Sequence, residues 1–181
     1  RAKIINFGIL YGMGVNALRA QLGSTTAEAH RYLDEYFSTF KQLSEYLERT
    51  KGFARTYGYT ETLFGRRRQF PEMKSSLPYV RAQAERMAIN APLQGTQADI
   101  IKLAMVRVDD MLEKEESLKD AHLLLQVHDE LVYEIRAKRV GELGAKIKSI
   151  MESVLPAEET GDVPIITVMK SGDDWGTMHT S

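Results

Sequence analysis

The segment LLLQVHDELVYEI (Leu123 to Ile135) places three consecutive polar residues between two runs of apolar and β-branched residues. Such runs predict two strands, and the short break between them predicts a tight turn that joins them as a hairpin. A turn at the surface can be polar simply because it meets water. The turn residues His128, Asp129 and Glu130 are therefore either an ordinary solvated turn or chemical groups held at the tip of a hairpin.

The composition limits the chemistry that the chain can perform. Its 181 residues are 43% hydrophobic, which is enough for one sizeable globular domain or two small ones. The chain has no cysteine, which excludes disulfide bonds, thiolate nucleophiles and sulfur-ligated metals, so a metal would need oxygen or histidine ligands. The apolar run near the start is too short to span a bilayer and is broken by glycines. The opening helix begins without a cap, which is typical of a segment cut from a longer chain.

Charge is distributed unevenly along the chain. The net charge is −1, but residues 1–107 hold 16 Lys and Arg against 9 Asp and Glu, while residues 108–181 hold 8 against 16. A basic half can bind phosphates, and an acidic half can bind cations. An uneven but merely solvated surface would give the same counts.

The first part of the chain is predicted to be helical. Glycines end the opening helix at Gly12 and a short second helix at Gly23. Thr25 and Glu28 have the spacing of a capping box, which predicts a longer helix that continues to about residue 51. Residues 55–71 are rich in β-prone residues around glycines, which predicts a short hairpin that ends at Pro71.

The second part is predicted to combine helices with strands. Ser75 or Ser76 can cap a helix that Pro92 is expected to end. Thr96 and Asp99 form a second capping box, for a new helix to about residue 115, and Asp99 is assigned to capping alone. The remaining expected elements are the hairpin strands 122–127 and 130–135, a helix over 137–155 and a third strand over 163–170.

The opening helix carries Lys3, Phe7 and Tyr11 at positions i, i+4 and i+8, and therefore on one face, with about 6 Å of rise per step. A cation, an aromatic ring and an aromatic ring with a hydroxyl fit a nucleoside triphosphate laid along the helix. Gly8 and Gly12 leave a neighbouring strip without side chains, where a flat base pair is expected to approach closely. Taken alone, the same spacing also fits aromatic residues packed in a core.

Four segments together resemble the family A DNA polymerases, the DNA polymerase I type. RAKIINFGILYGMG is similar to the nucleotide-binding helix of that family, and LLLQVHDELVYEI is similar to its second catalytic-carboxylate motif. TETLFGRRR and ERMAINAPLQGTQADIIKLAM lie between them in the same order, so the similarity covers essentially the whole chain. The resemblance implies an α+β fold in which residues 1–75 form part of a helical fingers subdomain and residues 76–181 form the carboxyl-terminal part of an antiparallel-sheet palm.

The resemblance implies that the polar turn is part of a catalytic centre. Asp129 would be a ligand of the Mg²⁺ ions used for phosphoryl transfer, Glu130 a nearby carboxylate with a lesser role, and His128 a neighbour of the primer terminus. Carboxylates suit Mg²⁺, a hard cation that takes one or two of them together with water and substrate phosphates. Two ions can stabilise both the attacking oxygen and the leaving group, and the family's other ligand Asp would lie outside this chain.

The same resemblance implies roles for the opening helix and for the segments that follow it. Lys3 would contact the triphosphate of a dNTP and give a proton to the leaving pyrophosphate, Phe7 would stack on the incoming nucleotide, and Tyr11 would stack near the template base. Planar guanidinium groups in the GRRR turn can meet phosphates, and polar side chains on the following helix can reach minor-groove acceptors. The expected DNA-binding residues are Arg66, Arg67, Arg68, Arg86, Asn90 and Gln94, together with Tyr11 and His128.

Two features of the family are missing from the sequence. An arginine is expected four residues before Lys3, and the first carboxylate motif is expected upstream of this helix. The sequence therefore predicts a piece of a polymerase that is inactive alone, with primer-template DNA, a dNTP and an amino-terminal polymerase segment as partners, in the cytoplasm at the nucleoid of a bacterial or phage-type system. The alternatives are a non-catalytic nucleic-acid-binding module on the same scaffold, a purely structural or interaction domain, and a related RNA polymerase.

Overall fold

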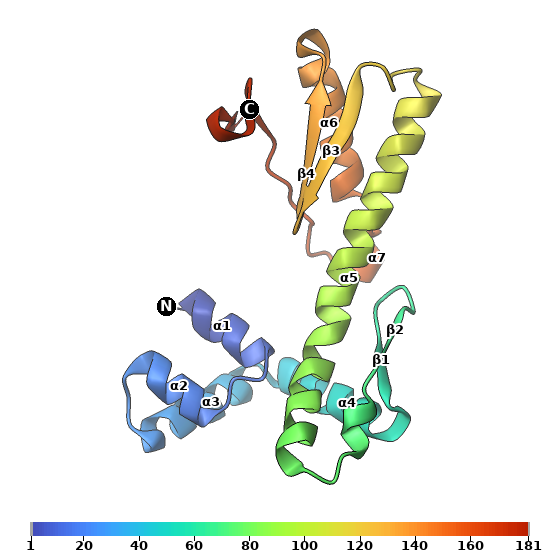
Figure 1. The fold of residues 1–181 in the computed structure, drawn as a ribbon. Coiled ribbons are helices and arrows are strands. Elements are labelled where there is room, and N and C mark those ends of the chain that lie inside the picture. Colours follow the sequence, from blue (N-terminus) through green and yellow to red (C-terminus); the bar gives the residue numbers. More distant parts are fainter. Residues whose placement is uncertain (1, 181) are drawn as a thin grey trace. The chain divides into compact units, whose positions relative to one another are not determined.

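The computed structural model describes residues 2–180, with side chains from residue 5 onward. The chain forms two compact units, Arg1–Thr96 and Gln97–Ser181, in which helices combine with small antiparallel sheets (Figure 1). The α+β class expected from the sequence is confirmed. No helix in the described part of the chain is long and apolar enough to cross a membrane.

The first unit begins with four helices. Ile9 and Leu18 are buried and pack with Ala29 and Leu33 in one core cluster. The second helix ends as predicted, because Gly23 adopts the left-handed conformation at its C-cap. The predicted capping box is also present, since Thr25 and Glu28 exchange both of its hydrogen bonds. The helices are α1 (Ala2–Leu10), α2 (Val15–Leu22), α3 (Thr26–Thr39) and α4 (Lys41–Tyr57).

The single helix predicted from the capping box to about residue 51 is wrong, because the chain breaks at Phe40 between α3 and α4. The hydroxyl groups of Ser38 and Thr39 both donate to the carbonyl oxygen of Glu35, at 2.9 and 2.8 Å. Hydroxyl groups that bond the backbone in this way compete with the helix ladder. The Phe40 ring then packs on Tyr36, 4.8 Å between centroids, and α4 begins anew. No glycine or proline marks this break in the sequence.

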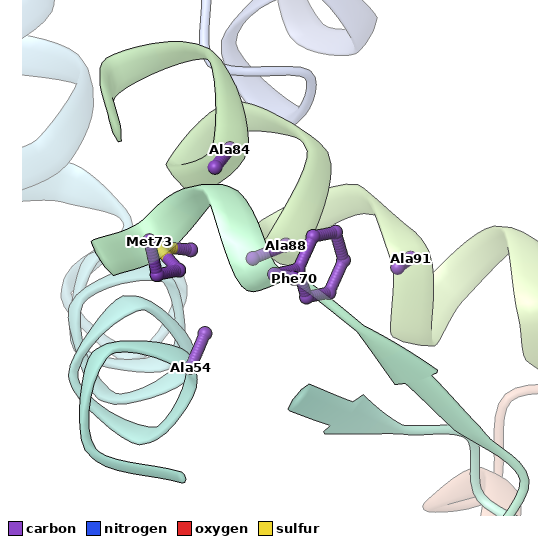
Figure 2. Packing of buried hydrophobic residues seen from close by; sticks show 6 residues of the cluster. All are labelled: Ala54, Phe70, Met73, Ala84, Ala88 and Ala91. Carbon is purple, nitrogen blue, oxygen red and sulfur yellow. The ribbon is translucent and has the colours of Figure 1, made fainter. Parts of the chain in front are cut away.

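The predicted first hairpin is confirmed. Strands β1 (Tyr59–Glu61) and β2 (Arg67–Gln69) pair antiparallel, and the 3₁₀ helix η1 (Pro71–Lys74) follows them. Phe70 is 1% exposed and anchors a cluster of buried residues (Figure 2). Small side chains face it from the next helix, which lets the hairpin segment approach closely. The cluster consists of Ala54, Phe70, Met73, Ala84, Ala88 and Ala91.

The predicted break at Pro92 is wrong, because α5 runs without interruption from Pro78 to Lys114. Proline removes one ladder hydrogen bond, but buried residues hold the helix on both sides of it, among them Ala91 before it and Ile101 after it. Thr96 lies inside the helix and does not cap it, because its hydroxyl accepts the backbone N–H of Leu63 at 2.9 Å. Asp99 also lies inside α5, so the capping role assigned to it is wrong. Tertiary contacts therefore outweigh the local cost of the proline.

The second unit is built around the second predicted hairpin, which is confirmed. Strands β3 (Ala121–Val127) and β4 (Glu130–Ile135) pair antiparallel, with an irregularity in register between Leu123 and Leu125. Helix α6 (Val140–Glu152), preceded by η2 (Ala137–Arg139), contributes Leu143 and Ile147 to the core. The end of α5 contributes Val108 and Leu112, and β3 contributes Ala121.

The third strand predicted over residues 163–170 is largely absent from the structure. Only Lys170–Ser171 (β5) pairs, with His179–Thr180 (β6), around the turn η3 (Trp175–Thr177) that follows the short helix α7 (Ala157–Thr160). The segment alternates half-buried with exposed residues, as a strand would, and Ile166 and Val168 are 75% and 69% exposed. A strand needs a hydrogen-bonded neighbouring strand, and among the described residues none pairs in this way with residues 163–169. Instead, the Glu152 carboxylate accepts the backbone N–H of Thr167 at 2.8 Å.

Replacement of Asp120 is expected to destabilise the second unit. The Asp120 side chain is 10% exposed and pairs with Arg136 at 2.7 Å and with Arg139 at 3.1 Å, which ties the start of β3 to the segment after β4. Because both arginines are partly exposed, we expect Asp120→Asn to lower the free energy of unfolding by about 1–2 kcal/mol. Urea denaturation measures the loss. The control is Glu142→Gln, at an exposed partner of Arg139, which should change stability less; an equal loss in both variants would contradict the prediction.

The second hairpin is expected to lose stability at high pH. Burial, together with the negative charge of Asp109, raises the pKa of Tyr133 to about 12. The unfolded residue has an ordinary pKa of 10.0, so the folded state holds the proton more tightly. This stabilisation is complete below the ordinary value and is lost as pH rises toward about 12. Burial also raises the pKa of Tyr46, so absorbance titration of tyrosinate should find more than one late group. The latest of them should be absent in Tyr133→Phe, and an unchanged titration curve in that variant would refute the assignment.

Candidate nucleotide and nucleic-acid site

The polar turn that joins β3 to β4 is as short as a hairpin allows. Val127 and Glu130 are paired residues, so His128 and Asp129 alone form the loop. His128 has a φ of +53°, a left-handed conformation that few residues other than glycine adopt. The Gln126 side-chain amide lies 3.5 Å from the His128 carbonyl oxygen, at the limit of a hydrogen bond. The turn therefore holds Asp129 at a defined position at the tip of the hairpin.

The turn offers oxygen ligands for a cation. His128, Asp129 and Glu130 are all exposed, so both carboxylates are accessible to solvent. Among the residues that the structure describes, no group of three or more His, Cys, Asp or Glu side chains could hold a metal ion. Mg²⁺ usually takes only one or two carboxylates, and substrate phosphates and water complete its shell. Asp129 and Glu130 therefore fit the one or two carboxylate ligands that Mg²⁺ takes from a protein.

Helix α1 and the turn after it present the aromatic face that the sequence predicts, with Phe7 on the helix and Tyr11 just beyond its last residue, Leu10. Phe7 and Tyr11 are 44% and 45% exposed, and their rings stack with 6.1 Å between centroids and 23° between planes. Ile9 lies on another face of the helix and is buried in the core of the first unit. The backbone of Lys3 belongs to α1, while its side chain lies outside the described residues. The two rings therefore form an exposed flat surface on a helix that its other face anchors.

The open glycine strip expected beside these rings is wrong, because the chain's own side chains fill it. A Cβ atom on Gly8 would meet the Met13 side chain. Gly12 has a φ of +77°, and a Cβ atom there would lie 2.6 Å from Cγ of Arg86. Glycine is needed at this position both for the turn after α1 and for the close approach of the Arg86 side chain. The segment that ends α1 thus contacts α5 within the first unit.

Three predicted DNA-binding residues share one face of α5. Arg86, Asn90 and Gln94 lie at i, i+4 and i+8, and the helix continues through Pro92, so the third residue stays in line with the first two. Arg86 and Gln94 are exposed. The Oδ1 atom of Asn90 is buried and has no hydrogen-bond partner among the described residues. A buried acceptor of this kind costs free energy unless a ligand satisfies it.

The three consecutive arginines make different contacts. Arg66 donates to the carbonyl oxygen of Gly95 at 3.0 Å, and Arg67 donates to the Glu61 carboxylate at 2.7 Å. The guanidinium of Arg68 lies over the Phe70 ring, 5.3 Å from its centroid. A Cβ atom on Gly95 would lie 2.5 Å from the Thr62 side chain, so glycine permits the hairpin to lie against α5. Arg66 fastens the hairpin to α5, and Arg67 and Arg68 are exposed on β2.

One exposed cluster was missed in the sequence. The rings of Phe53, Tyr57 and Tyr59 lie within 4.6 to 6.3 Å of one another, and Arg67 lies over Tyr59. The four-residue spacing of Phe53 and Tyr57 was visible, but the sequence predicts the helix to end near residue 51, whereas α4 continues to Tyr57 and brings both rings onto one helix. Tyr59 and Arg67 come from the two strands of the hairpin, and only the folded chain brings them to the helix.

The structure thus assembles the predicted residues in separate groups. In the first unit it places Arg86 against the end of α1. It also places the β1–β2 hairpin, which carries the three arginines and which we call the arginine hairpin, against α5. His128, Asp129 and Glu130 form the hairpin tip of the second unit.

Comparison with known proteins identifies the relatives of this chain. It is 45% identical over 174 residues to the thermostable DNA polymerase I of Thermus filiformis and 45% identical over 178 residues to DNA polymerase I of Pseudomonas aeruginosa. These matches cover 96% and 98% of the chain but only 20% and 19% of the relatives. The chain therefore spans about a fifth of the length of these curated relatives.

A solved structure gives the same result for the fold. The POL domain of Pol1 from M. smegmatis, in complex with DNA primer-template and dNTP, matches with a TM-score of 0.82 and 42% sequence identity. The match covers 90% of this chain and 28% of that chain. The family model described as DNA polymerase family A matches residues 1–177. The chain therefore belongs to DNA polymerase family A.

Proposed function

We propose that this chain is part of a polymerase that performs template-directed DNA synthesis in replication and repair. In this reaction the 3′-hydroxyl of a primer attacks the α-phosphate of a dNTP, and pyrophosphate leaves. Family membership and relatives named DNA polymerase I support the proposal. Because the chain spans about a fifth of those relatives, the activity is proposed for the whole polymerase and not for the 181 residues alone.

The observation that carries the proposal is the two-residue turn at His128 and Asp129. A solvated turn can adopt many loop lengths and favours glycine or asparagine where φ is positive. Here histidine takes the positive φ, and the adjacent aspartate stands at the tip of a paired hairpin. Uncommon backbone conformations in residues other than glycine concentrate at functional sites. This combination favours a functional carboxylate over an ordinary polar turn.

In the proposed role, Asp129 binds Mg²⁺ directly and Glu130 supports the same site. Mg²⁺ held by these carboxylates would stabilise the negative charge of the phosphates and favour ionisation of the primer hydroxyl. Two ions are expected, and the further ligand Asp belongs to the amino-terminal polymerase segment that we propose as the partner of this chain. His128 lies beside Asp129 in the turn and is proposed to contact the primer terminus.

Helix α1 is proposed to bind the incoming nucleotide. The stacked, exposed rings of Phe7 and Tyr11 offer a surface for the dNTP and for the template base, respectively. Lys3, four residues before Phe7, is proposed to contact the triphosphate and to donate a proton to the leaving pyrophosphate. A close cation at that position would stabilise the negative charge that develops on the leaving group.

The DNA duplex is proposed to contact α5 and the first hairpin. Arg86, Asn90 and Gln94 are aligned on one helix face, and hydrogen bonds to minor-groove acceptors shared by all base pairs would test duplex geometry without sequence preference. Arg66, Arg67 and Arg68 are proposed to approach phosphates.

In this assignment, residues 1–75 belong to the fingers and residues 76–181 to the palm of the polymerase. The 181 residues alone are proposed to be inactive, since the further ligand Asp is proposed to belong to the amino-terminal polymerase segment. The proposed function implies a cytoplasmic location at the nucleoid, where the DNA substrate lies. The competing assignment is a non-catalytic nucleic-acid-binding module on the same scaffold, which would not need a carboxylate pair at a strained turn.

Asp129→Ala is expected to abolish primer extension. We propose to complete the chain with a matching amino-terminal polymerase segment and to measure extension with Mg²⁺ and dNTPs. Loss of one group that stabilises transition-state charge costs about 10²–10³-fold in rate, so at least that loss is expected. Asp110→Ala, at an exposed carboxylate on α5, is the matched control and should extend like the wild type.

The two candidate functions differ in this experiment. A completed wild type that binds primer-template but does not extend it would favour the binding module. An Asp129→Ala variant that extends as fast as the wild type would refute the metal site at the turn. Activity of the 181 residues without a partner segment would refute the proposed division of the metal site.

A further inference from the structure

An aromatic surface lies on α4 and the first hairpin, and Arg67 is the one residue of it that is also assigned above to DNA. Arg49, Phe53 and Tyr57 lie at i, i+4 and i+8 of α4 and therefore along one stripe of the helix. Tyr59 on β1 and Arg67 on β2 continue the stripe beyond the end of the helix. We call these five residues the aromatic surface. In order it presents a cation, three aromatic rings and a second cation.

The rings hold one another in place while remaining accessible. Phe53 lies 4.6 Å from Tyr57 and 5.4 Å from Tyr59, and the second contact is edge-to-face. Tyr57 is nevertheless 61% exposed, and Phe53 is 36% exposed. A ligand that covers these exposed rings gains the free energy of burying apolar area. Because neighbouring rings already fix them, little conformational entropy is lost when the ligand binds. The surface is therefore preorganised for a flat apolar partner.

The charge around the rings points to a polyanion. Residues 49–74 contain seven Lys and Arg against two acidic residues, a net charge of +5. Lys51 and Arg55 pair with Glu48 and Glu85 outside this segment, so the charge around the rings remains positive but is smaller than this count. The Arg67 guanidinium lies 4.5 Å from the Tyr59 ring centroid. Glu61 accepts from its Nε atom, and no described residue accepts from its two Nη atoms, which leaves them for a phosphate. An apolar protein partner would bury the arginines at both ends of this stripe without pairing their charges, which is unfavourable.

We propose that the aromatic surface binds single-stranded DNA. Bases stack on Tyr57 and Phe53, while Arg49 and Arg67 contact the phosphates at either end. Stacking on aromatic rings in a basic surface is the general means of binding single strands without sequence preference. The inference rests on the proposed function for the identity of the strand, which is the unpaired template ahead of the primer terminus. Binding itself is assigned to this chain and requires neither Mg²⁺ nor a dNTP.

The test measures binding of fluorescein-labelled dT12 to the 181-residue chain by fluorescence anisotropy, at low and at moderate salt. Tyr57→Ala should weaken binding about fivefold or more, and Tyr57→Phe should retain the wild-type affinity, because stacking needs the ring and not the hydroxyl. Arg67→Gln should weaken binding and reduce the dependence of log K on log salt by about one counterion. Tyr32→Ala is the matched control: this tyrosine on α3 is 48% exposed and also lies near a guanidinium, that of Arg31 at 5.9 Å.

The proposal is overturned if the wild type does not bind dT12, if Tyr57→Ala binds as tightly as the wild type, or if Tyr32→Ala weakens binding as much. Circular dichroism checks that each variant is folded. Photocrosslinking of a bromodeoxyuridine oligonucleotide to the wild type needs no variant: crosslinks at Phe53, Tyr57 or Tyr59 support the site, and crosslinks confined to other segments overturn it.

Separate measurements distinguish this proposal from the proposed function. If the completed wild type extends a primer but Tyr57→Ala binds dT12 normally, only the aromatic surface is refuted. If the completed wild type does not extend a primer while dT12 binding depends on Tyr57, the polymerase assignment is refuted and the single-strand site stands. If both hold, Tyr57→Ala should slow extension on a template with a long single-stranded overhang more than on one with a single unpaired nucleotide.

Discussion

The continuity of α5 is the constraint on which most of the described structure depends. The helix runs from Pro78 to Lys114 through a proline that removes one of its own hydrogen bonds. Its first part supplies the small residues on which Phe70 and the arginine hairpin pack, and its last turns supply Val108 and Leu112 to the core of the second unit. The packing free energy of buried side chains on either side of Pro92 outweighs the local defect. Without this continuity, Gln94 would not share a face with Arg86.

Small residues at a few positions determine how closely the elements approach. Ala84, Ala88 and Ala91 leave room for the Phe70 ring (Figure 2). Gly95 leaves room for the Thr62 side chain. The same principle applies at the end of α1, where glycine at position 12 admits the side chain of Arg86. A large side chain at position 12 would separate the end of α1 from the helix that carries Arg86, Asn90 and Gln94.

The chemistry assigned to the chain depends on groups held in place by backbone geometry. Asp129 is positioned by a two-residue turn with a left-handed histidine, and the rings of Phe7 and Tyr11 are positioned by a helix whose other face is buried. Each arrangement restricts the conformations of the binding side chains in advance, which lowers the entropy cost of ligand binding. The aromatic surface on α4 follows the same principle, because its rings restrain one another while remaining exposed.

The sequence alone determined the elements whose signals are local: the capping box at Thr25 and Glu28, the glycine that ends α2, both hairpins, and the polar turn with Asp129 at its tip. Its motifs also identified the family, because a motif is recognised from its residue types and their order, without any knowledge of tertiary contacts. Tertiary structure alone decided the break at Phe40, the uninterrupted α5, the absence of a paired strand over residues 163–169, and the cluster of Tyr57, Tyr59 and Arg67. These features depend on partners distant in the chain. A helix crosses a proline only when packing on both sides compensates for the lost hydrogen bond, and a strand forms only when a neighbour supplies the other half of its ladder.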